Sequence, residues 1–304
     1  MATKEYAELF RALLDKQIVE NGTSGFMEDN AGSVIYSGGK EAKIPVINLK
    51  GLDDYDRDEG YSTGAVTYNY ETRVLSKDRG RRFRLDAVDV SAESFEQAAA
   101  DVAAEFQRVK VIPEIDAYRY SKLSGLAGIK VGNKTITKAN AVSELTAQIS
   151  EVLEATGGEG ELVVVISRQA YDALCASADV QKTLEVGTFQ QGDLSLNIKR
   201  FNGAAVIPVP QARLKSAYDF VTGDDGGFAP TTGAVDINWL VMPKNAPVAV
   251  SRTDTVKIIP PELNQFADAW DIDYRKYHDL FLPENKAAYV AACFKGAVPA
   301  VTGD

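Results

Sequence analysis

The chain has 304 residues, of which 45% are hydrophobic and 25% are charged, and this composition is ordinary for a folded protein with one large domain or two lobes. Its net charge of −10 and pI near 4.8 argue against a protein whose main function is to bind nucleic acid, since affinity for nucleic acid depends on Lys and Arg neutralising phosphates. No apolar run approaches the roughly 20 residues that a membrane-spanning helix needs, and two cysteines provide neither a disulfide framework nor a metal-ligand spacing, which favours a reduced, cytosolic site of synthesis.

The first predicted element is an amphipathic helix over residues 3–20. Its apolar residues recur at helical spacing and are Tyr6, Leu9, Phe10, Leu13, Leu14 and Ile18. The glycine-rich stretch Gly22–Gly25 ends it. Such a helix can pack on the core of its own chain or act as a terminal arm that packs on a partner, and the pattern leaves both interpretations open.

A strand is predicted over Ala42–Leu49, and the polar stretch after it is predicted to be a solvated loop. Five of the seven residues from Asp53 to Glu59 are acidic. A calcium loop of the EF-hand type needs Gly at its sixth position and Glu at its twelfth, and the spacing here does not match. No metal site is therefore predicted.

The stretch Val66–Val88, VTYNYETRVLSKDRGRRFRLDAV, is predicted to form a long β-hairpin. Apolar and polar residues alternate before and after SKDRG, which is predicted to be the turn, closed by Gly80. The hairpin has few residues that could anchor it to a core, and an isolated two-stranded hairpin is marginal in water. Its basic residues could contact nucleic acid, but the acidic chain favours pairing with acidic side chains or a charged protein contact.

The clearest helix begins after Ser91, a plausible N-cap, and is roughly 30 Å long at 1.5 Å per residue. Its apolar face includes Phe95, Val102 and Phe106. Pro113 is predicted to break or kink this helix. A shorter helix is predicted to follow over residues 114–128.

The second half of the chain mixes helices and strands without a βαβ repeat, which is typical of an α+β fold. Helices are predicted over residues 139–155 and 168–180, and buried strands over Leu162–Ser167 and residues 237–243. Two strands flank Asn202–Gly203, a strong turn dipeptide. Alternating strands are predicted again over residues 246–281, followed by a turn and a closing apolar strand.

The sequence contains no recognisable catalytic constellation. The only histidine, His278, lies in an alternating strand and is interpreted as structural, while Cys293 is interpreted as a buried small residue. One histidine excludes multi-histidine zinc sites, and no GxSxG elbow or phosphate-binding loop is present. We therefore predict no enzyme activity, no metal and no cofactor.

The order of these elements and their motifs resembles the major capsid protein of tailed bacteriophages, the Hong Kong-97 fold. In that family a hairpin leads to F-x-L/I-D-x-x-D, then to a long spine helix, then to P-E-I-D-A-Y. The matching residues here are Phe83, Leu85, Asp86, Asp89, Pro113, Glu114, Ile115, Asp116, Ala117 and Tyr118. Residues 137–149, 162–175 and 201–210 resemble the family's axial domain, and residues 265–292 resemble its closing peripheral strands.

The resemblance implies an α+β Hong Kong-97-type fold in four parts. These are an N-terminal arm (1–40), an extended β-hairpin loop (41–88), a peripheral domain with the spine helix (89–129 and 244–304), and an axial domain (130–243). The extended loop would lie over a neighbouring subunit, which would stabilise it. Its predicted intersubunit residues are Tyr68, Tyr70, Arg73, Lys77, Arg79, Arg81, Arg82 and Arg84, and the spine-helix residues are Phe95, Val102 and Phe106.

The implied function is structural: a virion protein that assembles as pentamers and hexamers into an icosahedral head around double-stranded DNA, in the cytoplasm of a bacterial host. Its partners would be copies of itself, a portal, packaged DNA held weakly and non-specifically, and no membrane. About 40 residues precede the loop, so a separate scaffolding protein is expected, and a decoration protein is left open. Two alternatives remain: an encapsulin-type compartment shell of the same fold, and an α+β enzyme with an unrecognised site.

Overall fold

The computed structural model describes most of the chain outside the N-terminus and several connecting segments. The described residues are 22–36, 41–48, 51, 54–55, 57, 61, 67–86, 102, 104–158, 160–177, 184–191, 194–221 and 226–299. The predicted helix over residues 3–20 lies outside them, as do Ser91, Phe95 and Asp89. Within the described part of the chain, no helix has the length and apolar character needed to cross a membrane.

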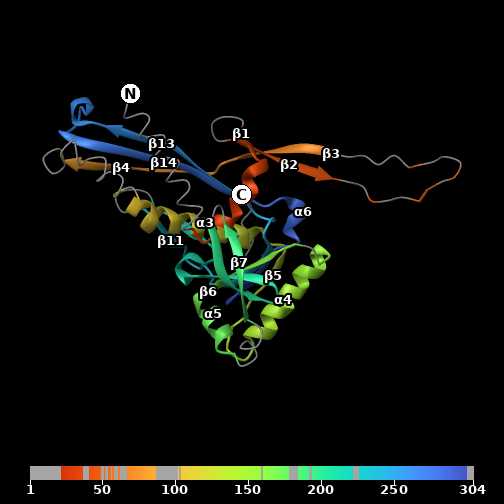
Figure 1. Ribbon diagram of the computed structural model, residues 1–304. Helices are drawn as coiled ribbons and strands as arrows, with labels where there is room; N and C mark the ends of the chain where they lie inside the picture. The colour runs from red at the N-terminus through yellow and green to blue at the C-terminus, as the bar shows by residue number, and fades with distance from the viewer. Residues whose placement is uncertain are drawn as a thin grey trace.

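A seven-stranded sheet forms the compact end of the molecule (Figure 1), in the order β5-β15-β12-β6-β9-β8-β7. Its strands are β5 (Ile129–Val131), β6 (Leu162–Ser167), β7 (Leu184–Gln191), β8 (Leu194–Phe201), β9 (Ala204–Val209), β12 (Ile237–Pro243) and β15 (Ala291–Phe294). The turn between β8 and β9 is formed as predicted, with positive φ at Asn202 (49°) and Gly203 (79°). Because β15 joins this sheet, the sheet draws on residues from both sides of the predicted boundary at residue 243.

Two hydrophobic cores lie on the two faces of this sheet. The core on one face is formed with α4 (Ala141–Thr156) and α5 (Arg168–Cys175), and the core on the other with α3 (Ile112–Leu126) and the short turn η1 (Gly25–Met27). The side chains of β6 alternate between them, which is why its apolar run is continuous, as expected for a strand buried on both faces.

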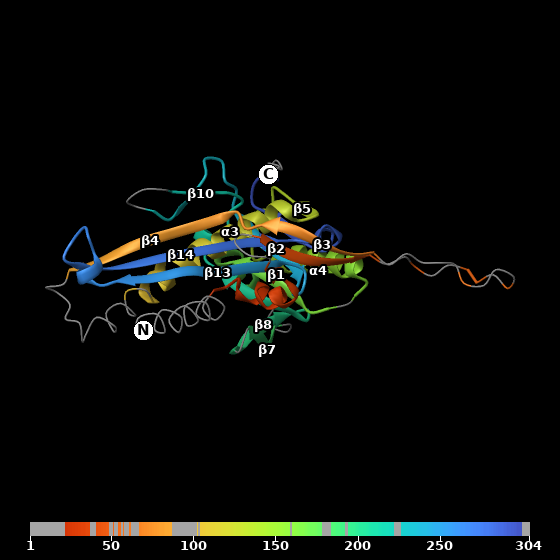
Figure 2. The same cartoon turned by 90° about the horizontal axis from the view of Figure 1, so that it is seen from above.

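A second, long sheet of three strands lies on the far side of α3 (Figures 1 and 2). Its order is β13-β14-β4, with β13 (Val248–Ile259) joined to β14 (Ala269–Phe281) through η6 (Pro261–Leu263), and with β4 (Lys77–Asp86) along the edge. A small hairpin of β10 (Tyr218–Phe220) and β11 (Phe228–Pro230) is paired nearby. The short helix α6 (Glu284–Ala287) precedes the closing strand β15.

The predicted hairpin over Val66–Val88 is wrong. The strand β3 (Thr67–Val74) pairs with β2 (Glu41–Asn48), and β2 also pairs with β1 (Ile35–Tyr36), whereas β4 pairs with β14. The strands β2 and β3 therefore form a two-stranded ribbon, called the ribbon below. It leads away from the body on the side opposite β4 (Figure 2).

Gly80 explains why the pattern was misleading. It is not a turn residue but lies inside β4, where an added Cβ would be 2.7 Å from the backbone oxygen of Tyr274. Glycine at this position allows β4 to approach β14 closely. Alternation predicted β3 and the part of β4 from Arg81 onward, but the first residues of β4 were assigned to a turn and the partners of both strands were not predicted.

Pro113 does not break the helix, so the predicted break is wrong, whereas the predicted kink stays a prediction. Residues 104–126 are helical throughout, with a π-helical stretch at Gln107–Val111 directly before α3. Pro113 lies in the first turn of α3, where a missing backbone N–H is tolerated, and the wider π turn before it accommodates the change in hydrogen bonding. Phe106 packs edge-on against Phe83, with ring centroids 4.7 Å apart, and thereby joins this helix to β4.

Candidate functional site

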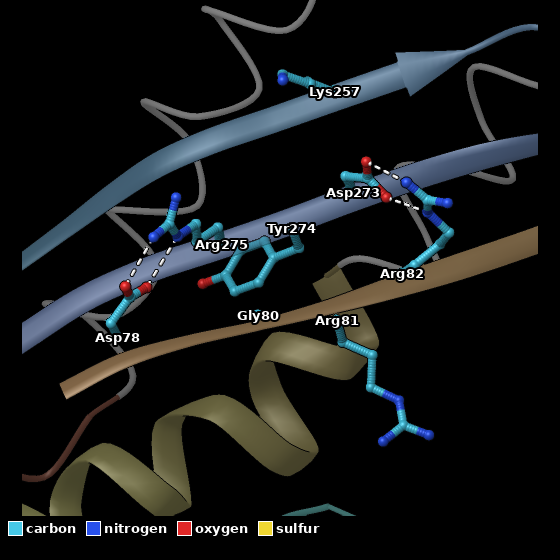
Figure 3. Close-up of a pocket in the computed structure, with 8 residues that line it drawn as sticks. All are labelled: Asp78, Gly80, Arg81, Arg82, Lys257, Asp273, Tyr274 and Arg275. Atoms are coloured by element: carbon cyan, nitrogen blue, oxygen red, sulfur yellow. Dashed lines mark hydrogen bonds and ion pairs between the residues drawn. The ribbon is translucent and has the colours of Figure 1, made fainter. Parts of the chain in front are cut away.

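The basic residues of β4 form ion pairs with acidic residues of β14 in the same chain. Arg82 donates to both carboxylate oxygens of Asp273, at 2.5 and 2.8 Å (Figure 3). Arg84 donates in the same way to Asp271, at 2.8 and 3.0 Å, and this bond is the main cause that lowers the pKa of Asp271. Both are bidentate pairs between directly opposed residues, which is the strong geometry for arginine and carboxylate.

The same surface contains a hollow of about 570 Å³. Its lining residues are Asp78, Gly80, Arg81, Arg82, Lys257, Asp273, Tyr274 and Arg275 (Figure 3). Arg275 donates to Asp78 at 2.8 and 2.7 Å, so the acidic groups of the lining are already engaged by arginines. The hollow is an ion-paired surface and does not have the arrangement of a nucleophile with a general base.

Two further basic residues of β4 hold the β10–β11 hairpin. Arg79 forms an ion pair with Glu114 at 2.5 Å and donates to the backbone oxygens of Val221 and Gly227, at 3.1 and 3.2 Å. The ammonium group of Lys77 lies 4.4 Å from the ring centroid of Phe220. The basic cluster therefore joins parts of one chain, and the prediction that it pairs with acidic groups is confirmed for Arg79, Arg82 and Arg84.

The polar residues of the P-E-I-D-A-Y motif each tie α3 to another part of the chain. Asp116 is buried and accepts hydrogen bonds from the backbone and hydroxyl groups of Thr23 and Ser24, at 2.6–3.2 Å, and pairs with Arg213 at 3.3 Å. This carboxylate fixes the start of the described chain against α3. Glu114 pairs with Arg79 as described above.

The next turn of α3 adds a second buried tie. Arg119 is fully buried, donates to the hydroxyl of Ser24 at 3.0 Å, and pairs with Glu28. Glu28 also accepts a hydrogen bond from the hydroxyl of Ser251 in β13, at 2.8 Å. One arginine thus connects α3 to the segment after η1 and, through Glu28, to the long sheet.

Asp279 fixes the joint between β3 and β4. It accepts hydrogen bonds from the backbone N–H of Ser76 at 2.9 Å, from the hydroxyl of Tyr118 at 2.7 Å and from the ammonium of Lys122 at 2.5 Å. Burial acts to raise the pKa of Asp279, but Lys122, Tyr118 and the Ser76 amide together hold it below its ordinary value. The direction of the chain as it leaves the ribbon is therefore set by α3 and β14.

Neither His278 nor Cys293 is placed for catalysis. Both are buried, and burial lowers the pKa of His278 well below 6.5 and raises the pKa of Cys293 to about 11. Among the described residues, no group of three or more His, Cys, Asp or Glu side chains could hold a metal ion.

The ribbon carries two of the predicted intersubunit residues on its surface, and Arg81, Arg82 and Arg84 are exposed on β4. Tyr70 and Arg73 are exposed, and Arg73 donates to Glu71 on the same strand at 2.6 Å. At the ribbon's outer end Tyr55 and Tyr61 are exposed, with ring centroids 5.0 Å apart. The side chain of Tyr68 lies outside the described residues.

Asp116, Arg119, Asp279 and the acidic residues of β14 were not singled out as binding residues from sequence. One signal could have found some of them: Asp271 and Asp273 alternate on β14 with the same period as Arg82 and Arg84 on β4. Opposite charges at matched period-2 spacing predict directly opposed strands. No comparable pattern marks Asp279, whose donors come from the β3–β4 connection at Ser76 and from Tyr118 and Lys122 on α3.

The chain shares its fold with solved capsid structures. It matches the capsid of Cyanophage P-SCSP1u with a TM-score of 0.55 and 12% identity, over 85% of this chain and 84% of that one. It matches the capsid of Ralstonia phage GP4 with a TM-score of 0.55 and 11% identity, over 86% of this chain and 84% of that one. It also matches a virus-like particle from Pyrococcus furiosus with a TM-score of 0.54 and 11% identity over 95% and 99%. Comparisons with family models and with curated protein sequences give no match.

These matches confirm the predicted fold class, because the likeness runs over most of each chain rather than over one shared motif. The fold is a mixed helix and sheet architecture of the kind that phage capsid proteins use. The predicted division into arm, loop, peripheral and axial parts stays a prediction.

Proposed function

We propose that this chain is the shell-forming subunit of a tailed-phage head, assembling as pentamers and hexamers into an icosahedral shell around double-stranded DNA. The observation that carries the proposal is the likeness to phage capsids over 84–86% of both chains. Two features of the molecule support it: an elongated body stiffened by internal ion pairs, and a two-stranded ribbon that leads away from that body.

In this proposal the ribbon β2–β3 is the extended loop that contacts a neighbouring subunit. Its base is anchored, because Ala42 and Ile44 of β2 pack with Leu75 in a core of the same chain. Its outer part has exposed tyrosines and no such core among the described residues, so a second chain would complete its burial. Tyr68, Tyr70 and Arg73 remain the proposed contact residues, whereas four of the five basic residues of β4 are assigned to the subunit's own fold.

The same reasoning gives the parts of the subunit different roles. The proposal keeps the division that the resemblance implies: an arm (1–40), a peripheral part (89–129 and 244–304) and an axial part (130–243). The strand β15 joins the peripheral part to the axial part through the seven-stranded sheet. A net charge of −10 suits a shell that holds packaged DNA weakly. Interfaces of about 1,600 Å² with polar contacts would allow misplaced subunits to leave during assembly.

A compartment shell that encloses protein cargo is the second candidate. It is favoured by the likeness to the virus-like particle, which covers 95% of this chain and 99% of that one. The two candidates share subunit contacts and differ in what the shell encloses.

Electron microscopy of the purified chain tests both candidates. Closed shells of uniform size support the proposal, and discrete monomers at every concentration and salt condition would overturn it. Nuclease-protected DNA inside particles from infected cells identifies a phage head, and co-purifying cargo protein identifies the compartment. A portal, scaffolding or decoration partner is sought in the same particles by mass spectrometry.

A further inference from the structure

The β10–β11 hairpin forms a two-stranded sheet of its own, inside the excursion that the chain makes between β9 and β12. The base of this excursion is closed, because Lys215 and Asp236 form an isolated β-bridge and an ion pair at 2.5 Å. From this base the hairpin leaves the seven-stranded sheet and lies against α3 and β4 (Figure 2). It therefore connects the compact end of the molecule to the long sheet.

The end of the hairpin is held to the rest of the subunit through Arg79 and Phe220. The guanidinium of Arg79 donates to the backbone oxygens of Val221 and Gly227, and the Phe220 ring is half-buried. None of the described residues from Tyr218 to Pro230 belongs to a hydrophobic core. Segments with few buried apolar contacts open at a lower free energy than core strands. The hairpin can therefore open while both large sheets stay folded.

Tyr118 of α3 lies between this hairpin and the joint between β3 and β4. Its hydroxyl lies 2.8 Å from the hydroxyl of Ser76 and donates to Asp279 at 2.7 Å, on the side of the joint. Its ring meets Phe220 edge-on, with centroids 5.8 Å apart, on the side of the hairpin. Tyr118 is buried, and a close-packed side chain cannot adjust one of these contacts without disturbing the other.

The first residues of β4 make a second connection between the joint and the hairpin. Lys77 directly follows Ser76, and its ammonium lies 5.2 Å from the ring centroid of Tyr118 and 4.4 Å from that of Phe220. Arg79, two residues further on, shares this face of the strand and also pairs with Glu114 of α3. A displaced hairpin would therefore take a partner from both residues.

We propose that the β10–β11 hairpin is a strap that couples the seven-stranded sheet to the joint between β3 and β4, and that Tyr118 and Arg79 carry the coupling. With the strap closed, as it is here, the ribbon leaves the body in one direction. With the strap open, Tyr118 and Lys77 lose the Phe220 ring and the joint loosens. A molecule that displaces the strap would then change the direction of the ribbon.

Hydrogen exchange of two backbone amides in the unassembled subunit tests the strap. The N–H of Val221 donates to the oxygen of Gly227 at 3.0 Å and reports on the strap, while the N–H of Ser76 donates to Asp279 at 2.9 Å and reports on the joint. Arg79→Met removes two charge-assisted hydrogen bonds and should raise exchange at Val221 by about tenfold or more. It should raise exchange at Ser76 by a smaller factor, with β6 unchanged.

Arg168→Met on α5 is the matched control. Arg168 also forms an ion pair, with Asp172 at 3.2 Å, and also lies near an aromatic ring, 5.7 Å from the centroid of Tyr171. Its replacement should leave exchange at the strap and at the joint unchanged. Unchanged exchange at Val221 in Arg79→Met would overturn the strap. If Arg79→Met also raises exchange in β6, Arg79→Lys decides in the same way, since it keeps the charge but loses the fork that reaches two oxygens.

Reciprocity tests the coupling, because a coupling free energy acts equally in both directions. Phe220→Leu changes only the strap and should raise exchange at the Ser76 amide. Ser76→Ala changes only the joint and should raise exchange at the Val221 amide. Variants that each loosen only their own side would overturn the coupling. The inference goes beyond the proposed function and is tested without shells, so a subunit that forms no shells would leave the strap standing, and an uncoupled hairpin would leave the shell standing.

Discussion

His278 should make the stability of the subunit depend on pH between about pH 8 and pH 5. It is the only histidine of the chain and is 3% exposed. Its ring meets Tyr118 edge-on, with centroids 5.2 Å apart, and its Nδ1 atom has no hydrogen-bond partner among the described residues. The charged groups that act on it are Arg119 from α3, Lys276 and Asp279 from β14, and Lys77 from β4.

The sign of the effect follows from the direction of the pKa shift. Burial, and after it Arg119 and Lys276, lowers the pKa of His278 well below 6.5 in the folded subunit. The unfolded chain binds this proton near its ordinary pKa, so the unfolded state holds more protons and folding stability falls as the pH drops below 6.5. One proton corresponds to about 1.4 kcal/mol per pH unit. The loss between about pH 8 and pH 5 is therefore about 2 kcal/mol.

Urea unfolding of unassembled subunits measures this contribution. Wild type and His278→Gln are compared at several pH values from about 8 to 5, and the carboxylates titrate in both proteins, so the difference between the two curves isolates His278. We expect the wild type to lose about 2 kcal/mol more than the variant over this range. In parallel, the single histidine resonance of the folded subunit should not titrate near 6.5. Parallel stability curves together with a resonance that titrates there would refute the reasoning.

Three further changes test the internal ties. Asp116→Asn replaces an acceptor oxygen with a donor NH₂ group that faces other donors, and should lower the free energy of unfolding in urea by about 3 kcal/mol. The control Asp172→Asn, in an exposed ion pair, should lower it by less than about 0.5 kcal/mol. Equal losses in the two variants would contradict the role of Asp116. Gly80→Val should force β4 away from β14 and lower stability by about 2 kcal/mol, while Gly32→Ala, which meets nothing within 4 Å, should be close to neutral. Replacing residues 49–66 with a short Gly-Ser linker should give a subunit that is folded by circular dichroism but forms no shells visible by electron microscopy. Normal shells would show that the outer part of the ribbon makes no contact needed for assembly.

The pairing of β4 with β14 determines what a deletion of Lys77–Arg82 would do. These residues form the first half of β4 and pair with β14 over their whole length. Their removal would take away an edge strand with its bidentate arginine, so we expect the deletion to damage the subunit's own fold.

The sequence predicted individual elements better than their partners. Alternation located β3 and β4 because the period of side chains along a strand is a local property. Which strand lies beside β4 depends on Asp273 and Asp271, which lie 191 and 187 residues further along than their arginine partners, and on the close approach at Gly80. A glycine after charged residues has the same local pattern in a turn as in a crowded strand.

The helix at Pro113 shows the same limit for a different reason. Proline inside a helix usually removes a hydrogen bond and clashes with the preceding turn. Here a π turn lies directly before it, and tertiary contacts hold both segments: Phe106 packs on β4, and Gln107 is buried against Tyr274 of β14. At its position in the first turn of α3, Pro113 does not carry the full cost of an interior proline, and packing on both sides holds the helix together.

The assignment of the basic cluster to the subunit's own fold reverses the expected effect of salt on assembly. If Arg79, Arg82 and Arg84 bound a neighbouring subunit, rising salt would screen that contact and favour dissociation. With these residues paired internally, the dominant charge effect between copies is repulsion between subunits of net charge −10, which salt also screens. We therefore expect the threshold concentration for shell formation, measured by light scattering, to fall as salt is raised from about 50 mM to about 500 mM. Shells that dissolve over this range would indicate instead that the charged residues of β4 bind a neighbouring subunit.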